Sequence, residues 1–258
     1  SISANGINAN VSAGDWDYAR AWLFQHHMDL WQQYATVGGP DLGGQFIGHV
    51  DLTRVGTFGH SRGGEGAILN LDVNRSLGSP YGVRAVFTIG ATNDERGIPT
   101  GAALGVLLPY CDGDQDTLPS VAYFDDSRYA LPGDPAAKHT FLVIGANHDN
   151  YNTNWDPDIM PVGSKDDWVN DFGNDDAFCN EMVSGSGRLD HDAQRATALL
   201  EGQAPTEEAI RAAAETASKE DVDPQSDINA TADYRRHLTQ VLGERALAEA
   251  VGRARGGE

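Results

Sequence analysis

Apolar residues gather in four short runs along the first 146 residues, and each run is rich in β-branched or aromatic side chains. The runs are RVGTFG (54–59), VRAVFTIG (83–90), ALGVLLPYC (103–111) and HTFLVIGA (139–146). Short, near-continuous apolar segments are typical of strands in a parallel sheet. The sequence therefore predicts four buried strands, with a fifth short strand, SIS, at residues 1–3.

Helical patterns alternate with these strands. Residues 17–35 repeat apolar side chains at helical spacing, in a stripe made of Phe24, Met28, Trp31 and Ala35 and widened by Leu23, Leu30 and Tyr34. Alternation of buried strands with helices predicts an α/β fold with a mostly parallel sheet covered by helices on both faces.

The pattern changes toward the C-terminus. Residues 149–187 are rich in Asp, Asn and Gly and predict long loops. Residues 206–220 and 232–256 are rich in Ala, Glu and Arg and predict two helices, separated by a stretch that contains Pro224. We therefore predict two parts, an α/β domain over residues 1–195 and a helical C-terminal segment over residues 196–258.

The net charge of the chain limits the kinds of partner that it can bind. The 258 residues carry a formal net charge of −20, which repels phosphate backbones and makes nucleic acid an unsuitable partner. No apolar run approaches the roughly 20 residues that span a bilayer, so no membrane partner is expected. The acidic surface favours a neutral or cationic substrate. No pattern indicates an oligomeric state.

The two cysteines, Cys111 and Cys179, allow either one disulfide or two free thiols. A disulfide would close a loop of about 69 residues. By lowering the entropy of the unfolded chain, it would contribute roughly 4 kcal/mol to the free energy of unfolding. It would also indicate an oxidising compartment. The N-terminus, SISANGINAN, has neither a basic region nor a long apolar region and is not a signal peptide.

The segment Gly59-His60-Ser61-Arg62-Gly63 fits G-x-S-x-G, the nucleophile elbow of serine hydrolases. A predicted strand precedes it and a helix start follows it. That context places the Ser61 hydroxyl at the carboxyl edge of the sheet, where the backbone N–H of Arg62 can donate to a developing oxyanion. The alternative is that Ser61 is only a residue in a glycine-rich turn.

A base and an acid follow in the required order. His148 comes after the strand at 139–146, and a loop could bring it over Ser61. The preceding strand is followed by Asp112, Asp114 and Asp116. Asp114 is the best placed acid, because it lies three residues past the strand, and Asp116 is the alternative. His148 as an ordinary loop histidine remains the competing interpretation.

Other candidate groups carry weaker signals. His26 and His27 are adjacent on a helix and point apart, so they are not expected to bind a metal. Asn150, Asn152, Asn154 and Asp156 resemble the start of a calcium loop, but the expected Gly and closing Glu are missing. Arg62 and Glu65 flank the serine and either line the pocket or form a surface ion pair. We expect no metal and no cofactor.

Residues 1–195 resemble the α/β-hydrolase superfamily, and within it the secreted bacterial serine esterases and polyester hydrolases. The resemblance is carried by GHSRGGEGA, YCDGD and GANHDNYN. It implies an extracellular esterase with Ser61 as nucleophile, His148 as general base and Asp114 as its orienting acid. It also implies a disulfide between Cys111 and Cys179 that ties the acid and histidine loops. SIS would correspond to the fold's fourth strand, so we expect the opening strands and the loop with the second oxyanion donor to be absent from this sequence.

The C-terminal segment resembles a different family. EGQAPTEEAIRAAAE and DPQSDINATADYRRHL are similar to the end of the flavin-binding medium subunit of carbon monoxide and xanthine dehydrogenases. The flavin-binding part of that subunit lies upstream and has no counterpart here, so FAD is not implied. We expect a fusion with a junction near residues 193–200.

Two functions follow from these observations. The first is a serine hydrolase that cleaves small or polymeric carboxylic esters through an acyl-enzyme. The alternative is an inactive hydrolase-fold fragment or interaction module, fused to an accessory segment of a molybdenum-flavin oxidoreductase.

Overall fold

The computed structural model describes residues 5–151, 176–180, 187–189, 194, 206–220, 231–234, 236–238, 240–241 and 244. The chain divides into two compact units, residues 1–143 and 144–258, and each unit is described by itself. The strand expected at residues 1–3, most of the loops expected at 149–187 and the stretch around Pro224 lie outside the described residues.

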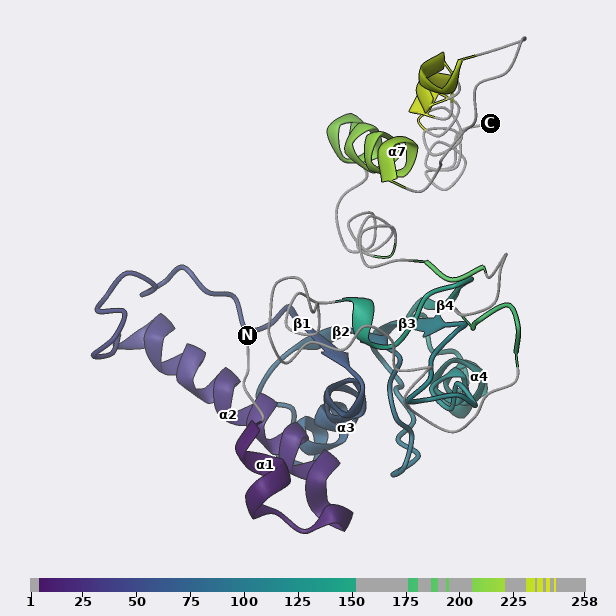
Figure 1. Ribbon diagram of the computed structural model, residues 1–258. Coiled ribbons are helices and arrows are strands. Elements are labelled where there is room, and N and C mark those ends of the chain that lie inside the picture. Colours follow the sequence, from purple (N-terminus) through teal and green to yellow (C-terminus); the bar gives the residue numbers. More distant parts are fainter. Residues whose placement is uncertain are drawn as a thin grey trace. The chain divides into compact units, whose positions relative to one another are not determined.

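The first unit alternates helices and strands (Figure 1). Its helices are α1 (Asn5–Asn10), the short 3-10 helix η1 (Ala13–Asp15), α2 (Trp16–Thr36), α3 (Arg62–Ser76) and α4 (Val121–Ala130). Its strands are β1 (Val55–His60), β2 (Val83–Ile89), β3 (Ala103–Pro109) and β4 (Lys138–Val143). All four predicted strands are confirmed, although β3 and β4 end two and three residues earlier than the apolar runs.

The four strands form one parallel sheet in the order β1-β2-β3-β4. Each strand is therefore next to the strand that follows it in the chain, and the connections between them carry α3 and α4. Because all strands run in the same direction, their carboxyl ends meet at one edge of the sheet. Segments that follow β1, β2 and β3 consequently begin side by side. The α/β class with a parallel sheet is confirmed.

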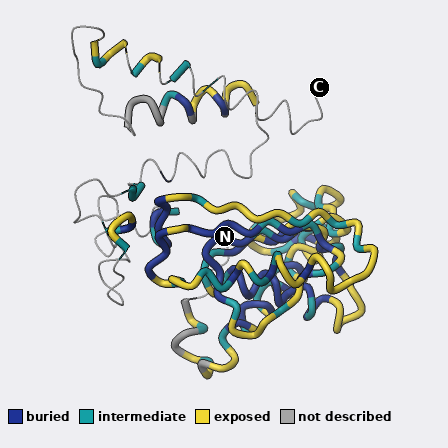
Figure 2. Tube along the Cα trace, turned by 90° about the vertical axis from the view of Figure 1, so that its right-hand side faces the viewer, coloured by how far each residue is buried: buried dark blue, intermediate teal, exposed yellow. Residues whose placement is uncertain are grey.

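The core lies between α3 and one face of the sheet. Ala67, Ile68 and Leu71 of α3 are buried, and they share one cluster with Val86 of β2 and Val106 of β3. Figure 2 shows buried stretches of the chain, drawn in dark blue, inside this unit. Burial of these aliphatic side chains contributes about 1.5–3 kcal/mol for each large residue, which is the main force that holds α3 on the sheet.

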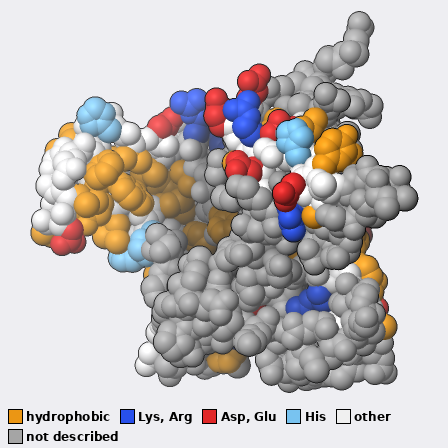
Figure 3. Space-filling model, turned by 45° about the horizontal axis from the view of Figure 1, so that its top comes forward, with side chains coloured by type: hydrophobic (Ala, Val, Ile, Leu, Met, Phe, Trp, Pro, Cys, Tyr) orange, Lys and Arg blue, Asp and Glu red, His pale blue; other side chains and the backbone are white. Residues whose placement is uncertain are grey.

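Helix α2 covers α3 with a more polar face than its sequence predicts. Its buried residues are Asp17, Arg20, Ala21, Gln25 and Met28. Trp31, which belongs to the apolar stripe, is 37% exposed, and Trp22, outside the stripe, is 50% exposed. Figure 3 shows hydrophobic side chains gathered on the side of the molecule where α2 lies. The apolar stripe predicted the helix correctly, although Trp31 within the stripe is exposed.

The small size of Gly66 explains why α2 turns its polar face toward α3. A Cβ at Gly66 would lie 2.6 Å from the Cβ of Arg20, so the two helices approach closely at this point. The Asn70 side-chain amide then donates to the Ala21 carbonyl across the interface, at 3.2 Å. Contact between the two backbones, and not apolar matching along the stripe, selects the buried face.

The second face of the sheet carries a row of aromatic rings. Phe58 stacks on Phe87 with ring centroids 6.0 Å apart, and Phe87 lies 6.4 Å from Phe141. Phe58 is 57% exposed and Phe141 is 44% exposed. Side chains alternate between the faces of a strand, so these rings point away from the cluster that contains Val86. The sequence predicts helices on both faces of the sheet. In the described residues, helices cover one face.

The second unit contains the short 3-10 helix η2 (Asp149–Tyr151) and helix α7 (Glu207–Glu220). Helix α7 matches the helix predicted at 206–220, and Ile210 and Ala214 on it are buried. The described residues between 232 and 244 are also helical, as predicted. Across the described part of the chain, no helix combines the length and the apolar character needed to cross a membrane.

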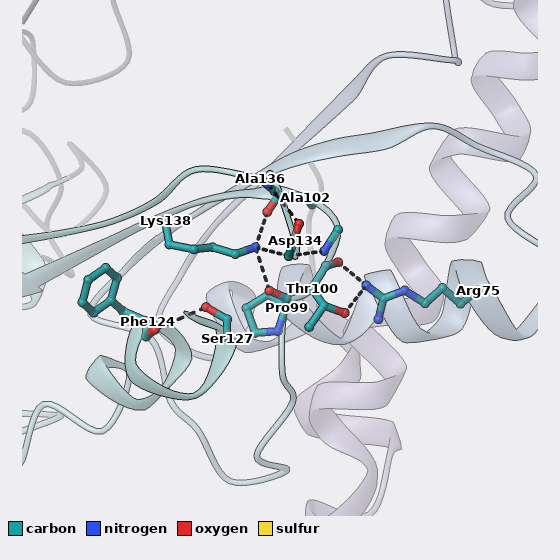
Figure 4. Close-up of polar contacts among 10 residues, drawn as sticks. Arg75, Pro99, Thr100, Ala102, Phe124, Ser127, Asp134, Ala136 and Lys138 are labelled. Carbon is teal, nitrogen blue, oxygen red and sulfur yellow. Dashed lines mark hydrogen bonds and ion pairs between the residues drawn. The ribbon is translucent and has the colours of Figure 1, made fainter. Parts of the chain in front are cut away.

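A buried ion pair holds the start of β4 (Figure 4). Lys138 Nζ lies 3.3 Å from Asp134 Oδ2, and both side chains are less than a tenth exposed. Lys138 also donates to the carbonyls of Pro99 and Ala102, at 3.0 and 2.6 Å. Asp134 accepts the N–H groups of Gly101 and Ala136, at 2.8 and 3.0 Å. The pair therefore joins the segment before β3 to the segment before β4.

Replacing Asp134 by Asn is expected to make stability less dependent on acid pH. The N–H of Gly101, the N–H of Ala136 and then Lys138 lower the pKa of Asp134 below its ordinary value of 3.8. A carboxyl with a lowered pKa in the folded state stabilises the protein above its unfolded pKa and loses that contribution as the pH falls below it. The midpoint of thermal unfolding should fall by several degrees at pH 6 in Asp134→Asn. The difference from the wild type should shrink below about pH 4.

Asp125→Asn is the matched control, because Asp125 forms an exposed ion pair with Arg128. Exposed pairs contribute little to stability. If Asp134→Asn lowered the midpoint of thermal unfolding no more than this control does, the buried pair would not stabilise the fold. A decrease that stayed constant down to pH 2 would contradict the role of the ionised Asp134 carboxylate.

Candidate active site

Ser61 occupies the apex between β1 and α3 with an unusual backbone conformation. Its φ is 56° and its ψ is −134°, a region that residues with a side chain rarely adopt and that costs on the order of 1–3 kcal/mol. Two hydrogen bonds hold the conformation. The Ser61 N–H donates to the Ile89 carbonyl at 3.0 Å, and the Ser61 carbonyl accepts the Gly64 N–H at 2.8 Å. Such a turn presents the serine side chain beyond the end of the strand, as the sequence motif predicts.

Two glycines make this turn possible, and only one of them is a glycine of the motif. A Cβ at Gly59 would collide with the Gly63 carbonyl, and a Cβ at Gly64 would lie 2.6 Å from the Cβ of Ala91. A Cβ at Gly63 would meet nothing within 4 Å. The close approach of α3 to β1 and β2 therefore requires Gly59 and Gly64, whereas Gly63 is free to change.

Arg62 is the first residue of α3. The first N–H groups of a helix have no acceptor within the helix, so the Arg62 N–H is suited to bind an anion beside Ser61. Its guanidinium lies over the Trp16 ring, 4.8 Å from the ring centroid. The side chain is thereby held against α2, and no ion pair joins it to Glu65 among the described residues.

The three aspartates after β3 have different environments. Asp112 is fully buried, and its Oδ1 accepts the N–H groups of Asp114 and Gln115 at 3.0 and 2.6 Å. Asp114 and Asp116 are exposed, and Asp114 Oδ2 accepts the side-chain amide of Gln115 at 3.0 Å. Asp112 therefore shapes the turn, and the turn carries Asp114 at the same sheet edge as Ser61.

His148 lies in the second unit, in a loop that Asn147 organises. Asn147 Oδ1 accepts the N–H groups of Asp149 and Asn150, at 2.6 and 3.2 Å. The Asn147 backbone N–H donates to Gln194 Oε1 at 2.7 Å, and its carbonyl accepts Gln194 Nε2 at 2.6 Å. Asn147 and Gln194 are fully buried, and His148 is 4% exposed. The loop is thus fixed by a residue 47 positions away for which the sequence carried no local signal.

Ser61 and Asp114 belong to the first unit and His148 to the second, and each is described within its own unit. The expected calcium loop from Asn150 to Asp156 lies mostly outside the described residues. Cys111 and Cys179 are both buried and form a disulfide. The bond that the hydrolase resemblance implied is confirmed.

Glu65 follows Ser61 by four residues and is fully buried. Its carboxylate accepts the Thr92 hydroxyl at 2.6 Å and the N–H groups of Asp94 and Glu95 at 3.0 and 2.6 Å. Glu65 therefore neither lines a pocket nor forms a surface ion pair. Instead, Glu65 holds the loop after β2 against the first turns of α3, directly behind the candidate nucleophile.

Asp17 of α2 adds a second buried carboxyl to this region. Burial first, and then the nearby carboxyl of Glu65, raise the pKa of Asp17 to about 6, while Arg20 opposes the shift. Arg20 Nη1 lies 3.8 Å from Asp17 Oδ1 and donates to the Trp16 carbonyl at 2.9 Å. The apolar pattern of α2 gave no indication that these charged residues face the core.

Comparison with known proteins bears on the C-terminal part of the chain. Residues 182–250 match a family model described as the CO dehydrogenase flavoprotein C-terminal domain. The similarity of the helical segment to that flavoprotein group is confirmed, and it begins before the expected junction at 193–200. No curated protein matches the chain.

The two glycines of the motif should respond differently to alanine. We expect Gly59→Ala to lower the free energy of unfolding by about 1–3 kcal/mol, because its Cβ would collide with a backbone carbonyl. Gly63→Ala should be neutral or should stabilise α3 by up to about 1 kcal/mol, since alanine favours helix over glycine. Urea unfolding of both variants measures the difference. Equal losses in the two variants would contradict the packing described at the turn.

Reduction of the disulfide is expected to lower the free energy of unfolding by about 4 kcal/mol, because an open chain gains entropy when it unfolds. Guanidinium unfolding with and without reductant measures this value. The double variant Cys111→Ser, Cys179→Ser is the control, and it should be insensitive to reductant. Coincident unfolding curves of the wild type in both conditions would show that the bond does not stabilise the fold.

Proposed function

We propose that this protein is a serine hydrolase that cleaves carboxylic esters, with Ser61 as the nucleophile. The observation that carries the proposal is the conformation of Ser61, with φ 56° and ψ −134° at the apex of a strand–turn–helix. A strained backbone persists where the surrounding structure enforces it, and it clusters at functional sites. A serine that served only as a turn residue would gain nothing from this strain, since glycine would adopt it freely.

In the proposed reaction the Ser61 Oγ attacks the ester carbonyl carbon while His148 accepts the hydroxyl proton. The oxyanion accepts a hydrogen bond from the Arg62 N–H. The C–O bond to the leaving alcohol then breaks, and His148 returns the proton to that alcohol. Water, deprotonated by His148, hydrolyses the acyl-enzyme and restores Ser61. Asp114 orients the imidazole, with Asp116 as the alternative acid.

Three features of the separate units support this assignment. The carboxyl ends of β1, β3 and β4 meet at one edge of the sheet, and the candidate residues follow those strands. The Asp112 turn fixes the backbone that carries Asp114. The Asn147–Gln194 pair fixes the backbone next to His148. Catalytic residues on rigid loops of this kind need little reorganisation during the reaction.

The substrate class and location follow from charge and disulfide chemistry. A net charge of −20 disfavours anionic substrates, so a neutral small or polymeric ester is proposed. A buried disulfide forms in oxidising compartments, which supports an extracellular location.

Fluorophosphonate labelling of the full chain, followed by peptide mapping, tests the proposal. We expect labelling at Ser61 that is absent in Ser61→Ala and lost in His148→Ala. Asp114→Asn should slow labelling by up to about 10⁴-fold, because replacing the aspartate of a Ser-His-Asp triad by asparagine lowers the reaction rate by about that factor. Asp116→Asn is the matched control and should label at the wild-type rate; the opposite ranking would make Asp116 the acid.

The family match at residues 182–250 favours a second candidate. On that proposal the hydrolase-like part is catalytically silent and the helical segment is an accessory piece of a molybdenum-flavin oxidoreductase. A folded sample that fails to label at Ser61 would support it. Absorbance of the purified chain should show no bound flavin under either proposal, because the matched family is the C-terminal domain alone.

A further inference from the structure

Three carboxylates converge behind the Ser61 turn, and they come from three different segments. Asp17 belongs to α2, Glu65 to α3 and Asp94 to the loop after β2. One oxygen from each lies within 4.8 Å of the others. Asp17 and Glu65 are buried, whereas Asp94 is exposed, so the cluster opens to solvent on the side of Asp94.

A buried oxygen in this cluster lacks a hydrogen-bond donor. Asp17 is only 5% exposed, and its Oδ1 has no hydrogen-bond partner in the described part of the chain. The Arg20 guanidinium, at 3.8 Å, is too far away to donate. Asn93, beside Asp94 in the loop, has a second buried side-chain oxygen without a partner. Buried acceptors of this kind are costly unless a proton or a cation binds them.

The charge of the cluster is suited to a divalent ion. Asp17, Glu65 and Asp94 carry three negative charges when ionised, and Arg20 supplies one positive charge beside Asp17. Two negative charges remain uncompensated by that pair. Arg62, the other guanidinium that acts on Asp17, is held over the Trp16 ring.

We propose that Asp17, Glu65 and Asp94 form a calcium site. Calcium binds six to eight oxygen ligands at about 2.3–2.6 Å, so two Ca–O bonds span up to about 5 Å, which covers the 4.8 Å of the cluster. Magnesium, with bonds of about 2.0–2.1 Å, spans only about 4.2 Å. Water entering beside exposed Asp94 completes the coordination. The ion ties α2, α3 and the loop after β2 together behind the turn, independently of whether Ser61 is reactive.

Terbium luminescence and thermal unfolding of the full chain test this site. Tb³⁺ is the probe, excited through the tryptophan that precedes Asp17, and Ca²⁺ displaces it. We expect one saturable Tb³⁺ site and a rise of several degrees in the midpoint of thermal unfolding with about 5 mM Ca²⁺, a concentration above the range of weak extracellular calcium sites. Asp94→Asn should lower the affinity for Tb³⁺ at least tenfold and abolish the calcium-dependent rise. Asp94 holds Glu65 through its backbone N–H, so this variant retains that contact.

Asp126→Asn is the matched control, because it removes the same charge from an exposed position on α4. It should bind Tb³⁺ and respond to Ca²⁺ as the wild type does. Asp17→Asn provides a second test, at the buried position of the cluster. In the folded variant, Ca²⁺ should no longer raise the midpoint of thermal unfolding. Calcium that stabilises wild type and Asp94→Asn equally would show only diffuse binding to an acidic surface and would overturn the site. Absence of any Ca²⁺ response in the wild type would leave a proton and Arg20 as the compensating charges, and would also overturn it.

Discussion

The structure of the first unit depends on the close approach of α3 to the ends of β1 and β2. Ser61 donates to the Ile89 carbonyl as though β1 continued, and its own carbonyl begins α3 by accepting the Gly64 N–H. The chain changes from strand to helix within one residue, which is sterically possible only because Gly59 and Gly64 lack a Cβ. The strain at Ser61 is offset by the apolar contacts of α3 with the sheet, since both are lost together if the helix moves away.

The same close approach creates the charged region behind the turn. Because α3 begins so near β2, Glu65 reaches the loop after β2 and accepts three hydrogen bonds from it. The contact of α2 with α3 at Gly66 then brings Asp17 and Arg20 into the interior. An apolar side chain in place of Glu65 would make none of these hydrogen bonds, so the buried carboxylate fixes the loop after β2 relative to the start of α3.

The histidine loop and the helical segment are related through Gln194. Gln194 makes paired hydrogen bonds with Asn147, and the Leu189 N–H donates to the Gly145 carbonyl at 2.9 Å. Leu189 and Gln194 therefore both contact the loop that carries His148, and both lie within the residues 182–250 that match the flavoprotein family model. Helix α7 begins within the matched residues, at Glu207.

The sequence by itself determined the strands, the order of Ser61, Asp114 and His148, and helix α7, because each depends on local periodicity or on residues close together in the chain. It determined the presence of α2 but not its buried face, since the contact at Gly66 outweighs the apolar stripe and leaves Trp31 exposed. Only the tertiary structure brought together Asp17, Glu65 and Asp94, or Asn147 and Gln194. Those groups come from separate segments, and no spacing rule relates residues that meet only when helices and loops pack.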